Sequence, residues 1–287
     1  MDFGSAHRFR RRSPPLAQRA DVWLGLIVAG LGFAFPAFGE CGRPAGKVEV
    51  VAVDERLDIG LADGRFIKLA GLDMPEPERG GPSARAARAF LLRRLVGREA
   101  ELDLLADGTD RWGRTLADLS PPAAQRDPAE SAASALLRAG YARVWPEFET
   151  RACAAYRLAL EDRARRDSLG IWADPEYAVI SSFDAAGLAR RDGQFVVLEG
   201  RVRRVGFGRS RLYLDLAPRD GPTIVVARRL EKAFANAGRP IDALVGQTIR
   251  ARGVLDDRFG PRLEVGEPAM IEVLRRWDAE GVDRQRP

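Results

Sequence analysis

Between residues 47 and 72, apolar and polar positions alternate with the period of two that is typical of β-strands. Val48, Val50 and Ala52 fall on one face of the first such segment. The pair Asp63-Gly64 lies between two apolar runs, a pattern that favours a hairpin turn. This part of the chain therefore predicts short antiparallel strands joined by tight turns.

Helical patterns follow these strands. An Ala- and Arg-rich helix is predicted from Gly81 to Leu95, and extended structure resumes at 101–104. Two further helices are predicted at 129–139 and 150–167. Strands, a helix and then further strands predict a mainly β, α+β fold, in which a small five-stranded barrel carries three helices.

A second pattern begins at Gln194. Three strands are predicted at 195–205, 211–216 and 223–226, then a helix at 230–237, then strands at 248–255 and 262–265. This is the element order of an OB-fold, so we expect a second, OB-like barrel. The predicted boundaries are 40–175 for the first domain, 176–193 for a linker, 194–275 for the second domain and 276–287 for a polar tail.

The N-terminus has the pattern of an export signal. Five arginines precede an apolar run from Val22 to Phe35, which Pro36 and the small residues Ala37 and Gly39 follow. We interpret residues 1–39 as a signal peptide of a secreted or periplasmic protein, the alternative being an N-terminal membrane anchor. After cleavage there is no predicted transmembrane span.

Composition limits the chemistry of the mature chain. The formal charge is +5, from 46 basic and 41 acidic residues, and removal of residues 1–39 leaves 41 and 39, or +2. The single histidine, His7, would be lost with the signal, which excludes Ser-His, Cys-His and His-metal chemistry. Two cysteines are too few for a thiolate metal site. Carboxylate, hydroxyl, Lys and Arg chemistry remains, and a hard metal held by oxygen fits it.

Both cysteines, Cys41 and Cys153, survive the predicted cleavage. In an exported chain an even cysteine count favours a disulfide between them, and two unpaired thiols are the alternative.

Three motifs lie in order within the first domain. They are Lys68-Leu69-Ala70-Gly71-Leu72-Asp73-Met74-Pro75-Glu76, Asp110-Arg111-Trp112-Gly113-Arg114-Thr115-Leu116-Ala117, and Gly140-Tyr141-Ala142-Arg143-Val144. Together with the closing Leu169-Gly170-Ile171-Trp172, this ordered set resembles the thermonuclease, or staphylococcal nuclease-like, family over about residues 46–175.

The resemblance implies an OB barrel and calcium-dependent hydrolysis of nucleic-acid phosphodiesters. On the family pattern Asp73 would be a Ca²⁺ ligand, Glu76 the general base and Arg114 a phosphate clamp. Pro75 fixes the backbone between the two carboxylates, so both can face one pocket.

The sequence departs from the family at two places. The family's Asp-Gly-Asp-Thr motif, whose second Asp binds calcium, is replaced by Asp54-Glu55-Arg56-Leu57-Asp58, and no residue clearly inherits that ligand. Depending on the alignment, Arg56, Leu57 or Glu55 takes its position. Lys68 stands where the family has an arginine that binds phosphate, so a bidentate guanidinium donor is replaced by a single point charge. Arg56 next to Lys68 predicts a pocket that holds phosphate more readily than calcium.

The second domain is rich in arginine and aromatic residues. Arg203, Arg211 and Tyr213 are candidates for contacts with single-stranded nucleic acid, and the alternative is that they form a solvated strand face.

Three hypotheses follow. The first is an exported phosphodiesterase acting on DNA or RNA, with weak or degenerate activity. The second is an inactive protein that binds nucleic acid or an envelope partner, and the third is a structural envelope protein.

Overall fold

The computed structural model describes residues 41–122, 130–218 and 221–274, with the backbone alone at 79 and 80. These residues belong to one compact unit. The predicted signal peptide, with its alternative as an anchor, and the polar tail from 276 lie outside the described residues. No helix in the described ranges is long and apolar enough to cross a membrane.

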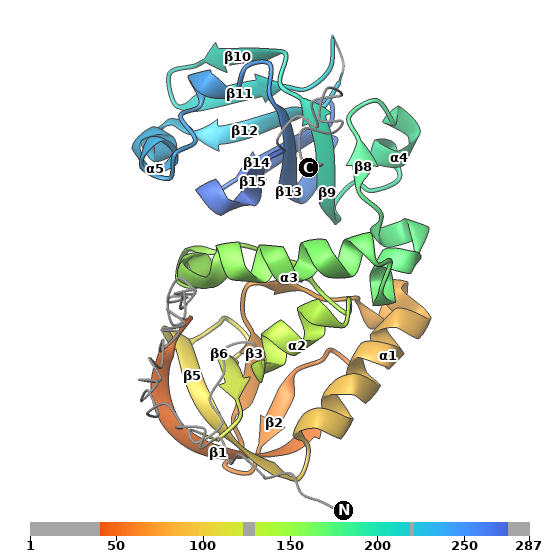
Figure 1. Cartoon of the computed structure of the whole chain (residues 1–287), viewed down its shortest axis with the longest axis vertical. Coiled ribbons are helices and arrows are strands. Elements are labelled where there is room, and N and C mark those ends of the chain that lie inside the picture. The colour runs from red at the N-terminus through yellow and green to blue at the C-terminus, as the bar shows by residue number, and fades with distance from the viewer. Residues whose placement is uncertain (1–40, 123–129, 219–220, 275–287) are drawn as a thin grey trace, which may run out of the picture. The chain divides into compact units, whose positions relative to one another are not determined.

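Five strands close a barrel in the order β1-β2-β3-β6-β5 (Figure 1). They are β1 (Arg43–Val53), β2 (Ile59–Leu61), β3 (Phe66–Leu69), β5 (Arg98–Thr109) and β6 (Thr115–Ser120). Only the β3–β6 pair of this barrel is parallel. A separate two-stranded sheet joins β4 (Leu72–Asp73) to β7 (Arg143–Val144).

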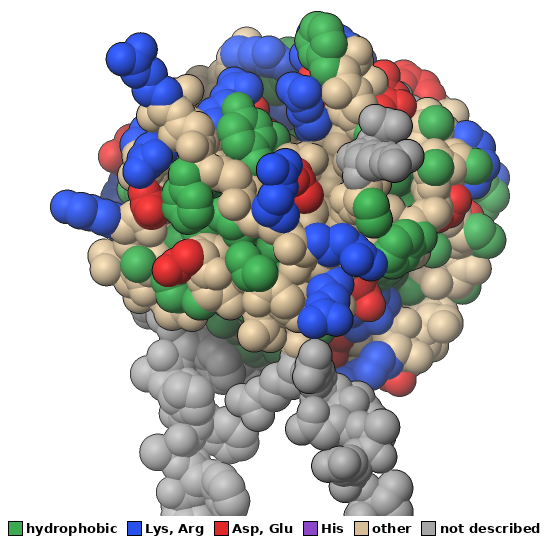
Figure 2. Space-filling model, turned by 90° about the horizontal axis from the view of Figure 1, so that it is seen from above, with side chains coloured by type: hydrophobic (Ala, Val, Ile, Leu, Met, Phe, Trp, Pro, Cys, Tyr) green, Lys and Arg blue, Asp and Glu red, His purple; other side chains and the backbone are tan. Residues whose placement is uncertain are grey.

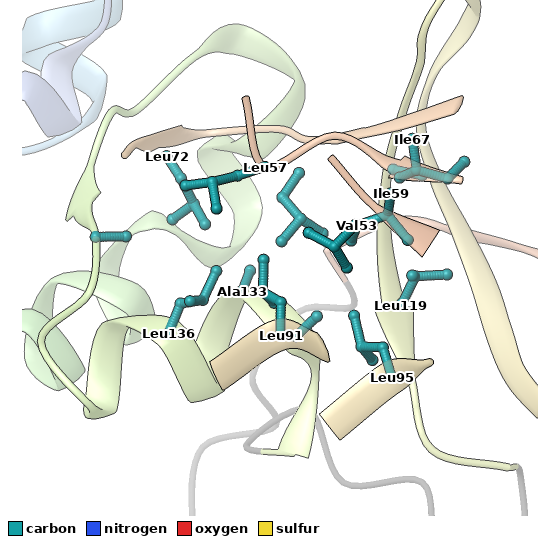
Figure 3. Close-up of a cluster of buried hydrophobic side chains, with 14 of the residues drawn as sticks. Val53, Leu57, Ile59, Ile67, Leu72, Leu91, Leu95, Leu119, Ala133 and Leu136 are labelled. Carbon is teal, nitrogen blue, oxygen red and sulfur yellow. The ribbon is translucent and has the colours of Figure 1, made fainter. Parts of the chain in front are cut away.

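The barrel encloses an apolar core because alternate strand residues face inward. Ile59 and Ile67, opposite each other on β2 and β3, are fully buried. The core continues into α1 (Pro77–Leu95) and α2 (Ala132–Arg138), where Leu91 and Leu136 point toward the strands (Figure 3). A third helix, α3 (Ala154–Arg166), completes the set, so the predicted α+β fold with a five-stranded OB-type barrel is confirmed.

The first helix begins earlier than predicted. It starts at Pro77, directly after Glu76, whereas the sequence pattern placed its start at Gly81. Proline suits the first helical position because the amide it lacks has no partner there. Gly81 lies inside α1 at φ +36°, where Pro82 follows it and the helix is kinked. Because of this early start, Glu76 is the N-cap residue of α1 and does not lie in a separate loop.

The predicted disulfide is present between Cys41 and Cys153, with their Cα atoms 5.1 Å apart. It ties the segment before β1 to the beginning of α3. In the chain-entropy model, a closed loop of this length stabilises the fold by about 4–5 kcal/mol.

The C-terminal unit contains one large sheet. Its strands are β8 (Ile180–Ser181), β9 (Phe195–Arg201), β10 (Arg204–Phe207), β11 (Arg211–Asp215), β12 (Thr223–Ala227), β13 (Thr248–Asp256), β14 (Arg262–Val265) and β15 (Ile271–Leu274). They follow the order β10-β11-β12-β14-β13-β9-β8, with β15 paired to β13. Because this path has two ends, β10 and β8, the second barrel stays a prediction.

Short helices complete this unit. α4 (Ala185–Ala189) and α5 (Glu231–Asn236) are α-helical. Its 3₁₀ turns and those before it include Phe148–Cys153, Gly170–Ala173, Pro175–Tyr177, Arg228–Leu230, Asp242–Leu244 and Pro268–Met270. β8 and α4 occupy the segment predicted as a linker, and the predicted domain boundaries stay predictions.

Two kinds of contact join the barrel helices to the C-terminal sheet. Ile171, Trp172 and Tyr177 form a buried cluster with Phe195 and Val197 of β9.

A buried ion pair lies nearby. The guanidinium of Arg252 on β13, fully buried, donates to both carboxylate oxygens of Glu161 on α3 at 2.8 and 2.9 Å. It also donates to the Val144 carbonyl at 3.1 Å and to Glu272. These contacts fix α3 and β7 against the sheet.

Candidate functional site

A tight turn between β1 and β2 carries the first candidate residues. The Asp54 carboxylate accepts the backbone N–H of Arg56 at 2.9 Å and that of Asp58 at 2.8 Å. Leu57 is buried at φ +66°, a conformation that is strained for a branched residue. Glu55 and Arg56 are exposed on the turn, whereas Asp58 is buried beneath it. The structure therefore buries Asp58 and leaves Glu55 exposed.

Asp58 reaches Arg114, the predicted phosphate clamp. Nη1 of Arg114 donates to both oxygens of Asp58 at 2.9 and 3.1 Å. Its Nε and Nη2 donate to Asp110 Oδ2 at 2.9 and 2.7 Å. Each nitrogen of the guanidinium thus already donates to a carboxylate of the protein itself. Trp112 lies between Asp110 and Arg114 in the sequence and is 59% exposed. The Arg114 guanidinium lies over its ring, 4.9 Å from the ring centre.

The pKa values of this cluster reflect burial and charge. Burial raises the pKa of Asp58, and the opposing effect of Arg114 does not cancel it. For Asp110 partial burial alone would raise the pKa, but hydrogen bonds from Arg114 outweigh it and the pKa is lowered. Burial would lower the pKa of Arg114, yet the two carboxylates raise it. Arg114 is therefore bound to a pair of carboxylates, which reduces its attraction for a phosphate.

Lys68 lies on the strand next to this cluster. It is half-buried on β3 and pairs in register with Leu116 of β6, two residues after Arg114. Its neighbour Ile67 faces the core, so Lys68 faces outward. Across the described parts of the chain, no carboxylate forms an ion pair with Lys68.

Asp73, the predicted metal ligand, is held by a different arginine. Asp73 on β4 lies opposite Arg143 on β7, and Nε and Nη2 of Arg143 approach its Oδ2 at 2.8 and 2.7 Å. Nη2 also donates to the Phe195 carbonyl at 2.9 Å. Burial raises the pKa of Asp73, an effect that the nearby Arg143 opposes without cancelling. Arg143 thus links Asp73 to the first residue of β9.

Asp73 and Glu76 line one cavity of about 40 Å³. Its other lining residues are Met74, Arg143, Glu176, Tyr177, Gln194 and Phe195. Since one water needs about 10–15 Å³, this volume holds roughly three waters and no nucleotide. Glu76 itself is exposed at the start of α1. The two carboxylates therefore share a small pocket that residues preceding and beginning β9 help to enclose.

The donor set does not fit a calcium ion. Ca²⁺ takes six to eight oxygens, several of them from carboxylates. In the described ranges no three ligating side chains are grouped closely enough to hold a metal. Asp73 is bonded to Arg143, and the exposed Glu55 does not line its cavity. No chemical step can be derived through a metal from these residues.

The candidates in the C-terminal unit lie elsewhere. Arg211 and Tyr213 are on β11, and Arg203 is exposed just before β10 with its guanidinium 5.8 Å from the ring centre of Phe183. None of the three predicted residues lines the cavity of Asp73.

Sequence reasoning missed two partners. Asp110 and Arg143 were recognised only as members of motifs and were given no role. The fold pairs Asp110 with Arg114 and Arg143 with Asp73. For Asp58, strand alternation offered a signal, since a residue directly before the buried Ile59 faces the opposite side.

Comparisons with known proteins relate part of the chain to nuclease-like proteins. Residues 66–174 match the model of the family described as staphylococcal nuclease homologue. The match begins at Phe66, after the turn at 54–58. The chain is also 28% identical to Protein ParB of Escherichia coli over 169 residues, which cover 58% of this chain and 89% of that protein. The matched range thus carries a nuclease-like fold of the kind that binds nucleic acid.

Proposed function

We propose that the chain binds nucleic acid on the outer face of its N-terminal barrel and cleaves it slowly or not at all. The observation that carries this proposal is the neutralisation of two of the three groups expected to act on a phosphodiester, Asp73 and Arg114. Asp73 is paired with Arg143, and Arg114 is paired with Asp58 and Asp110. The family match supports nucleic acid as the ligand.

Binding relies on cations that the protein does not already neutralise. Lys68 faces outward next to the Arg114 cluster, and Arg56 is exposed on the turn that precedes β2. Both side chains attract phosphate as charges, without a need for base contacts. We therefore expect affinity that falls steeply as the salt concentration rises.

Hydrolysis is disfavoured by the state of the carboxylates. Glu76 can take a proton from water only if that water is positioned against a phosphorus atom. The cavity that Glu76 shares with Asp73 is too small to admit a nucleotide. The carboxylate of Asp73 already accepts a hydrogen bond from Arg143. Proton transfer by Glu76 would therefore lack both a positioned substrate and a charge that stabilises the transition state.

An active phosphodiesterase is the second candidate. The observation in its favour is that Asp73 and Glu76, separated by three positions, do line one cavity. It requires that Arg143 and the start of β9 move away when substrate binds. Cleavage that disappears in Glu76→Gln would support this candidate.

Export also belongs to the proposal. The Cys41–Cys153 disulfide supports an oxidising compartment, since such bonds are rare in the reducing cytosol. N-terminal sequencing of the exported protein tests it: a new N-terminus near Glu40 is expected, and retention of residues 1–39 would favour the anchor.

Binding is tested by fluorescence anisotropy with a labelled single strand in chelator. The variant Lys68→Gln/Arg56→Gln is compared with the control Arg163→Gln/Arg166→Gln, which removes two exposed charges from α3. Each lost phosphate contact should reduce the salt slope by about 0.7. We expect a reduction of about 1.4 in the barrel variant and little change in the control. Absence of wild-type binding, or an unaffected barrel variant, would contradict the proposal.

A further inference from the structure

A groove of about 710 Å³ lies on the outward face of the C-terminal sheet. The strand register identifies this face, because residues directly opposite each other point to the same side of a sheet. Val225 of β12 is opposite Glu264 of β14, and both line the groove. Ile224 and Leu263, one position earlier on the same two strands, are opposite each other and buried in the core. The groove and the core of this unit are therefore on opposite sides of β12 and β14.

Part of the lining is apolar. Val225, Leu255 and Met270 are buried beside the groove, and Trp145 lines it as a half-buried ring. The turn between β13 and β14 carries Phe259, which also lines the groove. At 79% exposure it is the most exposed large hydrophobic side chain in the described ranges. The groove thus offers an aromatic ring that a ligand can cover.

The charged part of the lining is balanced. It consists of three arginines and three carboxylates, which are Arg211, Arg258, Arg262, Asp192, Asp256 and Glu264. Arg258 donates to both carboxylate oxygens of Asp256 at 3.0 and 2.8 Å. Arg211 and Glu264 are exposed and take part in no ion pair with another described residue. Figure 2 shows a similar mixture on the upper face of this unit, where basic, acidic and hydrophobic side chains lie next to one another.

This lining disfavours several classes of ligand. A nucleic acid gains little, because the charges sum to zero and its phosphates would meet three carboxylates. A wholly apolar molecule would remove water from charged groups without giving them partners. An extended peptide binds best where it can add a strand to a free edge, but β11, β12 and β14 each have a neighbouring strand on both sides. A neutral ligand with both an apolar face and many hydroxyl groups fits best.

We propose that this groove binds a neutral oligosaccharide. A pyranose ring has a face of C–H groups, which packs against the Phe259 ring. It also has a rim of hydroxyl groups, each of which donates and accepts hydrogen bonds, so Arg211 can donate to them and Glu264 can accept from them. The volume lies within the range of about 300–1,000 Å³ that is usual for sites of organic ligands. The inference goes beyond the proposed function and does not depend on it.

The test is calorimetric titration of the chain from Glu40 onward with three neutral tetrasaccharides, chitotetraose, cellotetraose and maltotetraose. We expect at least one of them to bind with one-to-one stoichiometry and to change the tryptophan fluorescence, because Trp145 lines the groove. The affinity should vary by no more than about twofold between roughly 50 and 200 mM salt, since an uncharged ligand releases no counterions.

Two variants examine the groove itself. Phe259→Ala should weaken tetrasaccharide binding roughly three- to tenfold, the scale of one ring contact. Glu264→Ala removes a charged acceptor and should weaken it at least about tenfold. Both residues are exposed, and thermal unfolding of each variant checks that the fold is kept.

The same unit supplies a matched control for each variant. Phe207 of β10 is 55% exposed, does not line the groove and is opposite the buried Leu212. Glu231 of α5 has a side chain that is 44% exposed and is also outside the groove. Phe207→Ala and Glu231→Ala should therefore bind the tetrasaccharide like the wild type.

Each other outcome overturns the inference. Absence of binding for all three tetrasaccharides contradicts it directly. Binding that neither Phe259→Ala nor Glu264→Ala weakens places the sugar elsewhere. Oligothymidylate binding that is lost in Phe259→Ala, or binding of a peptide of alternating Arg, Phe and Glu without any tetrasaccharide binding, identifies a different ligand for the groove. The proposed function is tested separately, because Lys68→Gln/Arg56→Gln should leave tetrasaccharide binding unchanged.

Discussion

The buried arginine of β13 gives the strongest prediction about stability. Arg252→Met removes two hydrogen bonds to Glu161 at 2.8 and 2.9 Å, one to the Val144 carbonyl at 3.1 Å and one to Glu272. Of the hydrogen bonds between described residues, Glu161 then keeps the one from the Val144 N–H, within a buried site. Breaking a buried ion pair from one side costs about 3–5 kcal/mol. For a chain of this size that corresponds to a melting temperature lower by roughly 6–20 °C.

Urea unfolding followed by tryptophan fluorescence and circular dichroism measures this loss, and coincident curves justify a two-state treatment. Arg204→Met is the control, since its pair with Asp215 joins a guanidinium that is 77% exposed, and it should unfold close to wild type. Adding Glu161→Gln to Arg252→Met should recover part of the loss, because the uncompensated charge is removed. Wild-type stability in Arg252→Met, or a double variant less stable than the single one, would refute the reasoning.

Three further predictions concern the disulfide, a turn and pH. Cys41→Ser/Cys153→Ser should lose about 4–5 kcal/mol in urea unfolding, and mass spectrometry that finds two free thiols in the native protein would overturn this. Gly71→Ala should destabilise the fold by calorimetry, because φ is +74° and a Cβ would lie 2.7 Å from Thr150; an unchanged melting temperature would contradict the geometry. Burial raises the pKa of Tyr177 to about 12. The neutral phenol therefore contributes fully to the stability of the fold below pH 10, and this contribution is lost as the pH rises toward 12. Tyr177→Phe should flatten the decline of stability above pH 10, and an identical decline would show that other groups cause it.

Local signals in the sequence predicted the local structure well. Asp63-Gly64 predicts a hairpin, and Gly64 has φ +86° in the turn between β2 and β3. The pairing of the two cysteines also followed from their number and the expected compartment. The turn depends on a few neighbouring residues, and the disulfide follows from the number of cysteines, so the sequence alone contains both signals.

The candidate site was harder to predict because its partners are distant along the chain. Arg114 is 56 residues from Asp58, and Asp73 is 70 from Arg143. No periodicity encodes such pairings, so Arg114 was expected to face a phosphate and not two carboxylates. The same applies to Arg252 and Glu161, 91 residues apart.

The most direct test of the account is the rate at which the chain from Glu40 onward, in excess, cleaves a labelled single strand with calcium and with chelator. We predict that the strand stays intact and bound in both conditions, because Asp73 is held by Arg143 and Arg114 by two carboxylates. Rapid cleavage that requires calcium and disappears in Glu76→Gln would contradict the central claim.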